Sequence, residues 1–386
     1  MKGHRPYLFA LVAVGLAASF ATGFELRSRS LETTTPRQPA SQTTLRSEVA
    51  AMLAAHYYAP LTARVLGAQT LPGMLHRLDD PYTRYLSPGD YRLLEDAESG
   101  AYAGIGVAVL RAHGGLLVTA SIPHLPASRA GLRAGDLITT IDGRSLVTLS
   151  YRSALDLMAG DEGTPVSLRV RPSDGGPPER VTLVRRSIAE PVVASRTIHA
   201  HGASYQYLRL FGFPASAAQS VRRLAQRAVQ RHADGLILDL RGNPGGLLSQ
   251  AVAVSRVFVD HGVVVSTVGL HEPEQSFYAN GTAVGKLPVV VLIDRSTASA
   301  AEVTAGALRL DDGAIVVGER SFGKGTVQAV EPLADGGALK LTVARFLLAG
   351  HVPVDGRGII PDLAVPDGAR GTSAFLREAV RALARA

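Results

Sequence analysis

The stretch 294–328 constrains this chain more than any other, because it places a serine and a lysine after two successive strands. An apolar run, 287–293, predicts a strand, and Ser299 follows it among small residues at the start of a helical pattern. A second apolar run, 314–317, leads into a glycine-rich loop that contains Lys324. A hydroxyl thus lies where a strand turns into a helix, and an amine lies in the loop after the next strand.

This arrangement suits nucleophilic catalysis by Ser299. Small neighbours let a substrate carbonyl approach, and the free N–H groups and dipole of a helix N-terminus stabilise a developing oxyanion. A serine hydroxyl needs a base, and Lys324 can be that base only when its amine is neutral. Its pKa would have to fall from about 10.4 toward ~7–8 in a dry pocket. We expect Phe322 and the flanking glycines to supply that pocket.

Two alternatives need no catalysis. Serine is a common helix N-cap, so Ser299 alone is compatible with a structural role. The stretch from Gly318 to Lys324 also matches most of a phosphate-binding loop. Gly325 stands where that loop needs Ser or Thr for the metal, and the following residues read as a strand instead of a helix, which argues against nucleotide binding.

The two segments together resemble a known family. Thr-Ala-Ser-Ala at 297–300, followed by Glu302, and Gly-Lys-Gly-Thr-Val-Gln at 323–328 resemble the carboxyl-terminal processing peptidases. These are serine proteases with a Ser/Lys catalytic pair. The resemblance covers roughly residues 45–365.

The resemblance implies a role for each residue of the motif. Ser299 would be the nucleophile, Lys324 the general base and Gln328 the residue that orients the lysine. The family usually has serine where this chain has Ala301, which lies outside the catalytic pair. Glu302 could face the site, but an acid in the first turn of a helix is favoured by the dipole in any case.

A second glycine loop follows the continuous apolar run 235–240, which predicts a strand buried on both faces. By itself the loop 241–248 is a strand-to-helix turn whose glycines let backbone N–H groups approach a ligand. It resembles the oxyanion loop of the same family, which implies that the N–H of Gly246 joins that of Ala300 in an oxyanion hole. Asp239 and Arg241 are expected to form a structural ion pair.

Residues 100–187 show short strand patterns with one helical piece at 151–158. Within them, 126–138 and 141–143 resemble a PDZ domain, a module that binds a peptide as an added strand and holds its terminal carboxylate with loop N–H groups. Gly104, Ile105 and Gly106 lie where that carboxylate loop would be. As a dinucleotide-binding motif they fail, since the third glycine and the following helix are missing.

The N-terminus is basic and then apolar over residues 7–24, which indicates either a cleaved signal peptide or a membrane anchor and an extracytoplasmic location. The expected divisions of the chain are a signal peptide or anchor (1–24), a linker (25–44), an N-terminal helical segment (45–99), a PDZ domain (100–187), a protease core (188–367) and a C-terminal helix (368–386).

Composition excludes several functions. The 386 residues include no cysteine, so disulfides, thiol catalysis and a lipoprotein anchor are ruled out. The net charge of +7 comes from dispersed basic residues, and the chain has no Trp. We therefore expect no nucleic-acid partner, although an anionic membrane surface suits the charge. No metal-ligand spacing occurs, and His199, His201 and His351 have no partner for a triad, so we expect no metal and no cofactor.

These patterns predict a mixed α/β protease core with β-rich parts, an inserted PDZ domain and an N-terminal helical segment. The predicted function is a secreted or membrane-tethered serine endopeptidase that cleaves proteins near their C-termini, with the PDZ domain capturing protein or peptide substrates that have apolar C-termini. One alternative is a catalytically silent PDZ scaffold that binds peptides. Another is an enzyme that needs an adaptor or activator protein, or whose PDZ domain blocks the site until a ligand binds.

Overall fold

The computed structural model describes residues 42–189, 192–311, 313–365 and 372–385. The predicted signal peptide or anchor and most of the predicted linker lie outside these residues. The chain divides into two units, one of residues 101–190 and one that contains 42–100 and the residues from 192 onward. Each unit is described by itself.

The larger unit is built on a six-stranded, mostly parallel sheet. Its strands, in spatial order, are β10 (Val193–Ala200), β11 (Ala203–Leu210), β12 (Gly235–Asp239), β15 (Val289–Ile293), β16 (Ile315–Gly318) and β20 (Leu363–Ala364). β10 runs antiparallel to β11, and each later pair of neighbours is parallel. β12 and β15 are buried at every position, which confirms the strands expected from the two apolar runs.

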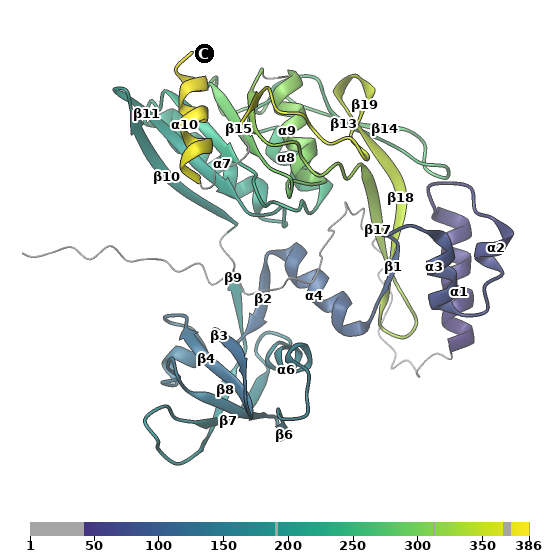
Figure 1. Cartoon of the computed structure of the whole chain (residues 1–386), viewed down its shortest axis with the longest axis vertical. Coiled ribbons are helices and arrows are strands. Elements are labelled where there is room, and N and C mark those ends of the chain that lie inside the picture. The colour runs from purple at the N-terminus through teal and green to yellow at the C-terminus, as the bar shows by residue number, and fades with distance from the viewer. Residues whose placement is uncertain (1–41, 190–191, 312, 366–371, 386) are drawn as a thin grey trace, which may run out of the picture. The chain divides into compact units, whose positions relative to one another are not determined.

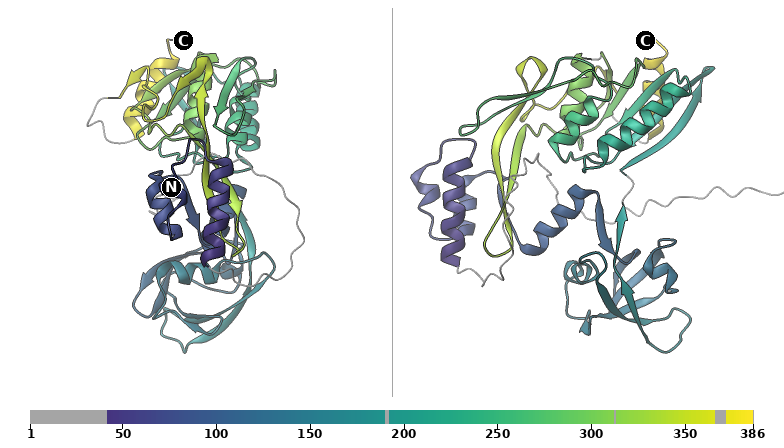
Figure 2. Two further views of the ribbon diagram at one scale, coloured as in Figure 1. Left: turned by 90° about the vertical axis from the view of Figure 1, so that its right-hand side faces the viewer. Right: turned by 180° about the vertical axis from the view of Figure 1, so that it is seen from behind.

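Helices cover both faces of this sheet. They are α7 (Ala217–Gln230), α8 (Leu248–Ser255), α9 (Ala300–Asp311) and α10 (Thr372–Leu383). Leu236 and Leu238 of β12 join the core cluster that includes α7, α8 and α9, whereas Ile237 joins the cluster that includes α10. Figures 1 and 2 show α7 and α10 on opposite faces. Because β12 and β15 are parallel neighbours, the loops that follow them start side by side. They lie at the carboxyl ends of the strands, where ligands of such folds bind.

A second sheet of the larger unit is antiparallel and centred on the long strand β18. It contains β1 (Arg84–Leu86), β13 (Val263–Val268), β14 (Gln275–Tyr278), β17 (Thr326–Pro332), β18 (Ala338–Leu348) and β19 (Val352–Pro353). β17 begins just after Lys324 and contains Gln328. Apolar side chains of this sheet belong to the same core as the helices α8 and α9, so both sheets fix the segment that holds the lysine.

The N-terminal part of the larger unit is helical. Its helices are α1 (Gln42–His56), α2 (Ala63–Leu66), α3 (Leu71–Leu78) and α4 (Pro88–Ser99). Val49 and Leu53 of α1 are fully buried in the core cluster that also contains β18 residues, as their helical spacing predicts. The turn between α3 and β1, residues 79–83, places Tyr82 and Thr83 against the second sheet.

The smaller unit contains a six-stranded antiparallel sheet with short helices. Its strands, in spatial order, are β3 (Val107–Ala112), β4 (Gly115–Ser121), β5 (Leu137–Ile141), β7 (Pro165–Arg171) and β8 (Glu179–Val184), with β6 (Arg144–Ser145) also on β5. The helices are α5 (Pro126–Arg129) and α6 (Tyr151–Met158), and a separate pair, β2 (Ala101–Gly104) and β9 (Arg186–Ala189), joins the two ends of the unit. β3 is an edge strand of this sheet.

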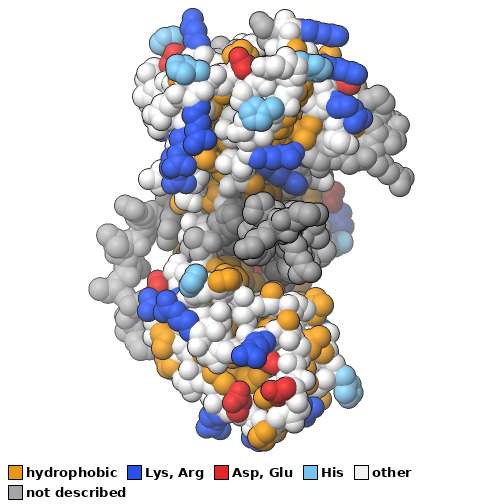
Figure 3. Space-filling model, turned by 90° about the vertical axis from the view of Figure 1, so that its left-hand side faces the viewer, with side chains coloured by type: hydrophobic (Ala, Val, Ile, Leu, Met, Phe, Trp, Pro, Cys, Tyr) orange, Lys and Arg blue, Asp and Glu red, His pale blue; other side chains and the backbone are white. Residues whose placement is uncertain are grey.

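Two sequence expectations concern the distribution of basic residues and the presence of a membrane-spanning helix. On the face drawn in Figure 3, lysine and arginine side chains lie in several small groups spread over the surface. Within the described ranges, no helix is long and apolar enough to cross a membrane.

Candidate active site

Ser299 lies between β15 and α9 in a left-handed backbone conformation, with φ of 57°. That conformation is strained for any residue other than glycine, and such strain is often kept at functional sites. The side chain is completely buried, and its Oγ has no hydrogen-bond partner. Because an unpaired buried hydroxyl costs about 1–3 kcal/mol, the position of Ser299 is not explained by stability.

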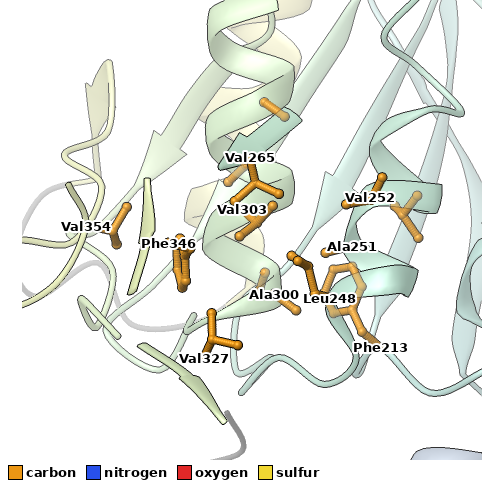
Figure 4. Close-up of a cluster of buried hydrophobic side chains, with 14 of the residues drawn as sticks. Phe213, Leu248, Ala251, Val252, Val265, Ala300, Val303, Val327, Phe346 and Val354 are labelled. Carbon is orange, nitrogen blue, oxygen red and sulfur yellow. The ribbon is translucent and has the colours of Figure 1, made fainter. Parts of the chain in front are cut away.

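The apolar residues that directly follow Ser299 belong to a cluster of buried apolar side chains. Figure 4 shows Ala300 at the start of α9 among apolar side chains that include Val303, Val327 and Phe346. Ala300 directly follows the serine, and Val327 directly precedes Gln328. This packing fixes the backbone on both sides of the candidate site.

Lys324 is 1% exposed, and its Nζ lies 4.4 Å from the centre of the Tyr82 ring. Its loop is held close to the segment 354–358. A Cβ on Gly323 would lie 2.8 Å from the N atom of Gly358, and one on Gly325 would lie 2.5 Å from that of Asp355. The glycines therefore bring the lysine into the interior, as expected. Phe322 does not: its side chain is 55% exposed, so the prediction that it dries the pocket is wrong.

Glu302 ties the serine segment to the lysine loop. Its buried carboxylate accepts hydrogen bonds from the Ser299 N–H (2.8 Å), the Gly323 N–H (2.7 Å) and the Lys324 N–H (2.9 Å). It also accepts one from the Ser321 hydroxyl (2.5 Å). Burial raises the pKa of Glu302, and these four hydrogen bonds oppose that rise. Glu302 thus faces the site, in addition to lying in the first turn of α9.

The glycine loop after β12 lies directly against the serine. A Cβ on Gly245 would come within 2.9 Å of the Ser299 Cβ and 3.0 Å of the Ala300 N atom. The buried Asn243 shapes the loop: its Oδ1 accepts from the Gly245 N–H, and its backbone carbonyl accepts from the Ala298 N–H. Among the described residues, neither the Gly246 N–H nor the Ala300 N–H donates to an acceptor. The oxyanion-hole assignment of these two groups stays a prediction.

Gln328 is fully buried on β17, next to a β-bulge. Its amide nitrogen donates to the hydroxyls of Thr326 (2.9 Å) and Thr342 (3.3 Å). Its Oε1 accepts no hydrogen bond, so the expected orienting bond from Lys324 is not formed in this structure. The role of Gln328 remains a prediction.

A buried ion pair supports the strand that leads into the glycine loop. Arg241 donates two hydrogen bonds to the Asp239 carboxylate, at 2.8 and 2.6 Å, which confirms the expected ion pair. Tyr207 donates to the same carboxylate at 2.6 Å, and burial with the nearby Asp239 charge raises the pKa of Tyr207 to about 12. The Arg241 guanidinium lies 4.4 Å from the ring centre of Phe375 in α10.

In the smaller unit, the residues predicted to hold a peptide carboxylate form a compact loop before β3. Ile105 is buried, and its carbonyl accepts from the Ala127 N–H. Gly106 has φ of 80°, and a Cβ there would lie 2.5 Å from the Leu125 Cβ. The loop, which begins at Gly104, thus needs glycine for both backbone shape and space.

The three histidines considered for a triad lie at the surface, as predicted. His199, His201 and His351 are exposed. Within the part of the chain that the structure describes, no cluster of His, Asp and Glu could hold a metal. Sequence reasoning missed Tyr82 and Asn243, and it did not foresee the four bonds of Glu302.

Two family models match the chain: peptidase family S41 over residues 204–365 and the PDZ domain over residues 117–172. A carboxyl-terminal-processing protease of Synechocystis is 37% identical over 306 residues, which are 78% of this chain and 72% of the relative. The chloroplastic carboxyl-terminal-processing peptidase 2 of Arabidopsis thaliana is 33% identical over 322 residues, 80% of this chain and 62% of its own.

Among solved structures, the photosystem II D1 C-terminal processing protease matches with a TM-score of 0.55 and 27% identity, over 89% of this chain and 97% of that one. These matches first define the class: a serine-type peptidase, and hence a hydrolase, with a PDZ domain. Within that class, the chain belongs to the carboxyl-terminal-processing proteases of peptidase family S41. The predicted family, enzyme class and mixed α/β fold with a PDZ domain are confirmed.

Proposed function

We propose that this chain is an endopeptidase that cuts proteins near their C-termini through Ser299 and Lys324. The observation that carries the proposal is the buried Ser299 hydroxyl, which has no partner and sits on a strained residue beside a glycine loop. Glu302 joins the backbone of Ser299 to that of Lys324, which keeps the two segments within reach of each other.

The mechanism follows from these positions. Neutral Lys324 takes the proton as the Ser299 Oγ attacks the amide carbon of the substrate. The N–H groups of Gly246 and Ala300 stabilise the oxyanion, and Gln328 accepts a hydrogen bond from the lysine once it has turned toward the serine. Protonated Lys324 then gives its proton to the leaving amine, and water hydrolyses the acyl-enzyme. The reaction needs no cofactor.

Cleavage of an unstructured protein by the full chain tests the catalytic pair. We expect Ser299→Ala and Lys324→Ala each to lower the turnover rate at least about 1,000-fold, as loss of a nucleophile or its base does. Ser296→Ala and Lys286→Ala, at exposed positions of the same residue types, should stay within about 2-fold of the parent. Retained turnover in either of the first two variants would refute the proposal. If the unsubstituted protein binds peptides but does not cleave them, the alternative of a catalytically silent PDZ scaffold is favoured.

The PDZ unit captures the C-terminal end of the substrate, as the loop 104–106 before the edge strand β3 suggests. Gly106→Ala should weaken binding of a peptide with an apolar C-terminus. Gly143→Ala is the matched control, because Gly143 has a similar φ of 77° but its added Cβ would meet nothing within 4 Å. Equal affinity of the two variants for the peptide, measured by fluorescence anisotropy, would argue against this loop as the binding site.

The active chain lies outside the cytoplasm, as the basic and then apolar N-terminal sequence indicates. Mass spectrometry of the N-terminus of the chain isolated from cells tests this. Removal of residues 1–24 means secretion, and retention with membrane association means an anchor. An intact N-terminus on a protein found in the cytosol would contradict the assignment.

A further inference from the structure

We propose that Tyr82 holds the amine of Lys324 in a resting position, away from Ser299, so that the catalytic pair forms only when this contact is released. This inference rests on the roles proposed above for Ser299 and Lys324. Tyr82 is then a positioning residue that sets the fraction of molecules in which Lys324 is paired with Ser299.

The first observation concerns the three polar groups that should meet in an active enzyme. The Lys324 Nζ lies 4.4 Å from the Tyr82 ring centre. In the active pair the Ser299 hydroxyl would donate to the neutral amine, and the Gln328 Oε1 would accept from it. Both oxygens are buried and have no hydrogen-bond partner. Neither oxygen is therefore bonded to the lysine, and the amine lies over the Tyr82 ring.

The second observation is chemical. The face of an aromatic ring attracts an ammonium group, and it does so more strongly where water is excluded. Lys324 is almost fully buried, so the Tyr82 ring stabilises the charged amine, which is the form that cannot accept the serine proton. Burial, together with the carboxylates of Asp355, Asp80 and Glu302, raises the pKa of the Tyr82 phenol, so the ring itself stays neutral.

The third observation is that Tyr82 is placed by a well-bonded turn. The Tyr82 N–H donates to Asp80 Oδ1 at 2.9 Å, and the Thr83 hydroxyl donates to Asp80 Oδ2 at 2.6 Å. Thr83 in turn accepts from the Thr342 N–H of β18 at 3.0 Å. The turn between α3 and β1 is thus attached to the sheet beside Gln328, and a shift of this turn would move the ring off the lysine.

The rate at which a fluorophosphonate labels the serine tests the proposal without the need for substrate delivery. Cation–π contacts of this kind correspond to about a 3- to 30-fold change in an equilibrium. Tyr82→Leu in the full chain should therefore be labelled about 3- to 30-fold faster. Its kcat on an unstructured protein should rise by a similar factor, with KM within about 2-fold. Tyr82→Phe keeps the ring and should behave like the parent.

Two controls and one replacement variant make the outcome decisive. Tyr85→Leu removes a neighbouring tyrosine that donates to Asp335, and it should leave the labelling rate unchanged. If Tyr82→Leu does not fold, Tyr82→Met makes the same test with a more adaptable side chain. The double variant Tyr82→Leu with Lys324→Ala should lose the gain, because the ring acts through the lysine.

Labelling of Tyr82→Leu at the parent rate or more slowly, with folding intact, would overturn the resting-contact proposal while leaving the Ser299/Lys324 pair in place. Labelling of Lys324→Ala at the parent rate would instead overturn the assignment of the base, and this proposal with it. The two failures are thus distinguishable.

Discussion

Arg185 in one unit and Glu302 in the other are buried charged side chains with four hydrogen bonds each, but the two connect different kinds of groups. In the PDZ unit, Arg185 donates to the carbonyls of Leu157, Met158 and Pro165 and to the hydroxyl of Thr164. In the protease unit, Glu302 accepts from the serine segment and the lysine loop. Arg185 leaves no unpaired neighbour among those groups, whereas the Ser299 hydroxyl beside Glu302 has no partner.

The unpaired hydroxyl beside Glu302 distinguishes a group of polar residues that serves catalysis from one that only stabilises the fold. A buried charge is costly, and full pairing of its surroundings is what stability alone requires. Where an unpaired polar atom persists beside such a charge, the arrangement serves something other than stability. Substitutions at Glu302 and Arg185 should therefore have different effects on activity and stability.

The largest expected effect is on activity, from Glu302→Ala. Removing the carboxylate leaves three N–H groups and the Ser321 hydroxyl without their acceptor, at about 1–3 kcal/mol each, and frees the serine segment from the lysine loop. We expect kcat/KM to fall at least about 100-fold, measured at a temperature where the variant is still folded. Glu302→Gln keeps one acceptor oxygen and should lose less. If the activity falls only in proportion to the fraction of folded protein, Glu302 has the same purely structural role as Arg185.

The counterpart is Arg185→Met, which keeps much of the side-chain volume. It leaves the carbonyls of Leu157, Met158 and Pro165 without this donor, so we expect hydrogen exchange in residues 101–189 to indicate a loss of roughly 3 kcal/mol. Hydrolysis of a short peptide that bypasses the PDZ unit should stay within about 2-fold. A large loss of that hydrolysis would show that Arg185, like Glu302, is needed for activity and not only for stability.

A smaller effect is expected at Tyr207, which supports the glycine loop through Asp239. Tyr207→Phe should lower the free energy of unfolding by about 1–2 kcal/mol near neutral pH. The folded pKa of about 12 lies above the unfolded value of about 10, so the native state keeps the proton longer. The contribution of Tyr207 is therefore complete below pH ~10 and lost as pH rises toward 12. Urea unfolding of both proteins across this range measures it; a constant difference would contradict the assignment.

The smallest expected effect concerns the PDZ edge strand. The Tyr151 hydroxyl of α6 donates to the Val109 carbonyl of β3 at 2.9 Å, and β3 is the edge to which a peptide would be added. Tyr151→Phe frees that carbonyl, so a peptide with an apolar C-terminus should bind about 2- to 5-fold more tightly by anisotropy. Ser153→Ala, on the same helix, serves as the control. Unchanged or weaker binding would mean that the hydroxyl does not compete with the peptide.

Much of the fold could be predicted because its signals are local. β12 and β15 are apolar at every position since both faces of the sheet are covered, and α6 has the bounds that its pattern predicts. β10 was missed because it is an edge strand whose polar side chains, such as those from Ser195 to Thr197, are mostly exposed. Its position depends on pairing with β11, which its own composition does not reveal.

In the candidate site, too, only the contacts between residues close in sequence could be predicted. The spacing of Ser299 and Glu302 predicts only the bond from the serine N–H, which resembles a helix cap. The bonds from Ser321, Gly323 and Lys324 join separate loops and have no local signal. Tyr82 is brought to Lys324 by tertiary packing from a distant part of the chain, and Phe322, beside the lysine in sequence, points away into solvent.

The stacking of Arg241 on Phe375 has a consequence for the order in which this protease is made. The strand that precedes the glycine loop is translated long before α10, yet the arginine beside that loop leans on a ring from α10. A nascent chain that has not yet produced residue 375 lacks this support. The contact between the arginine beside the glycine loop and α10 is therefore completed only near the end of synthesis.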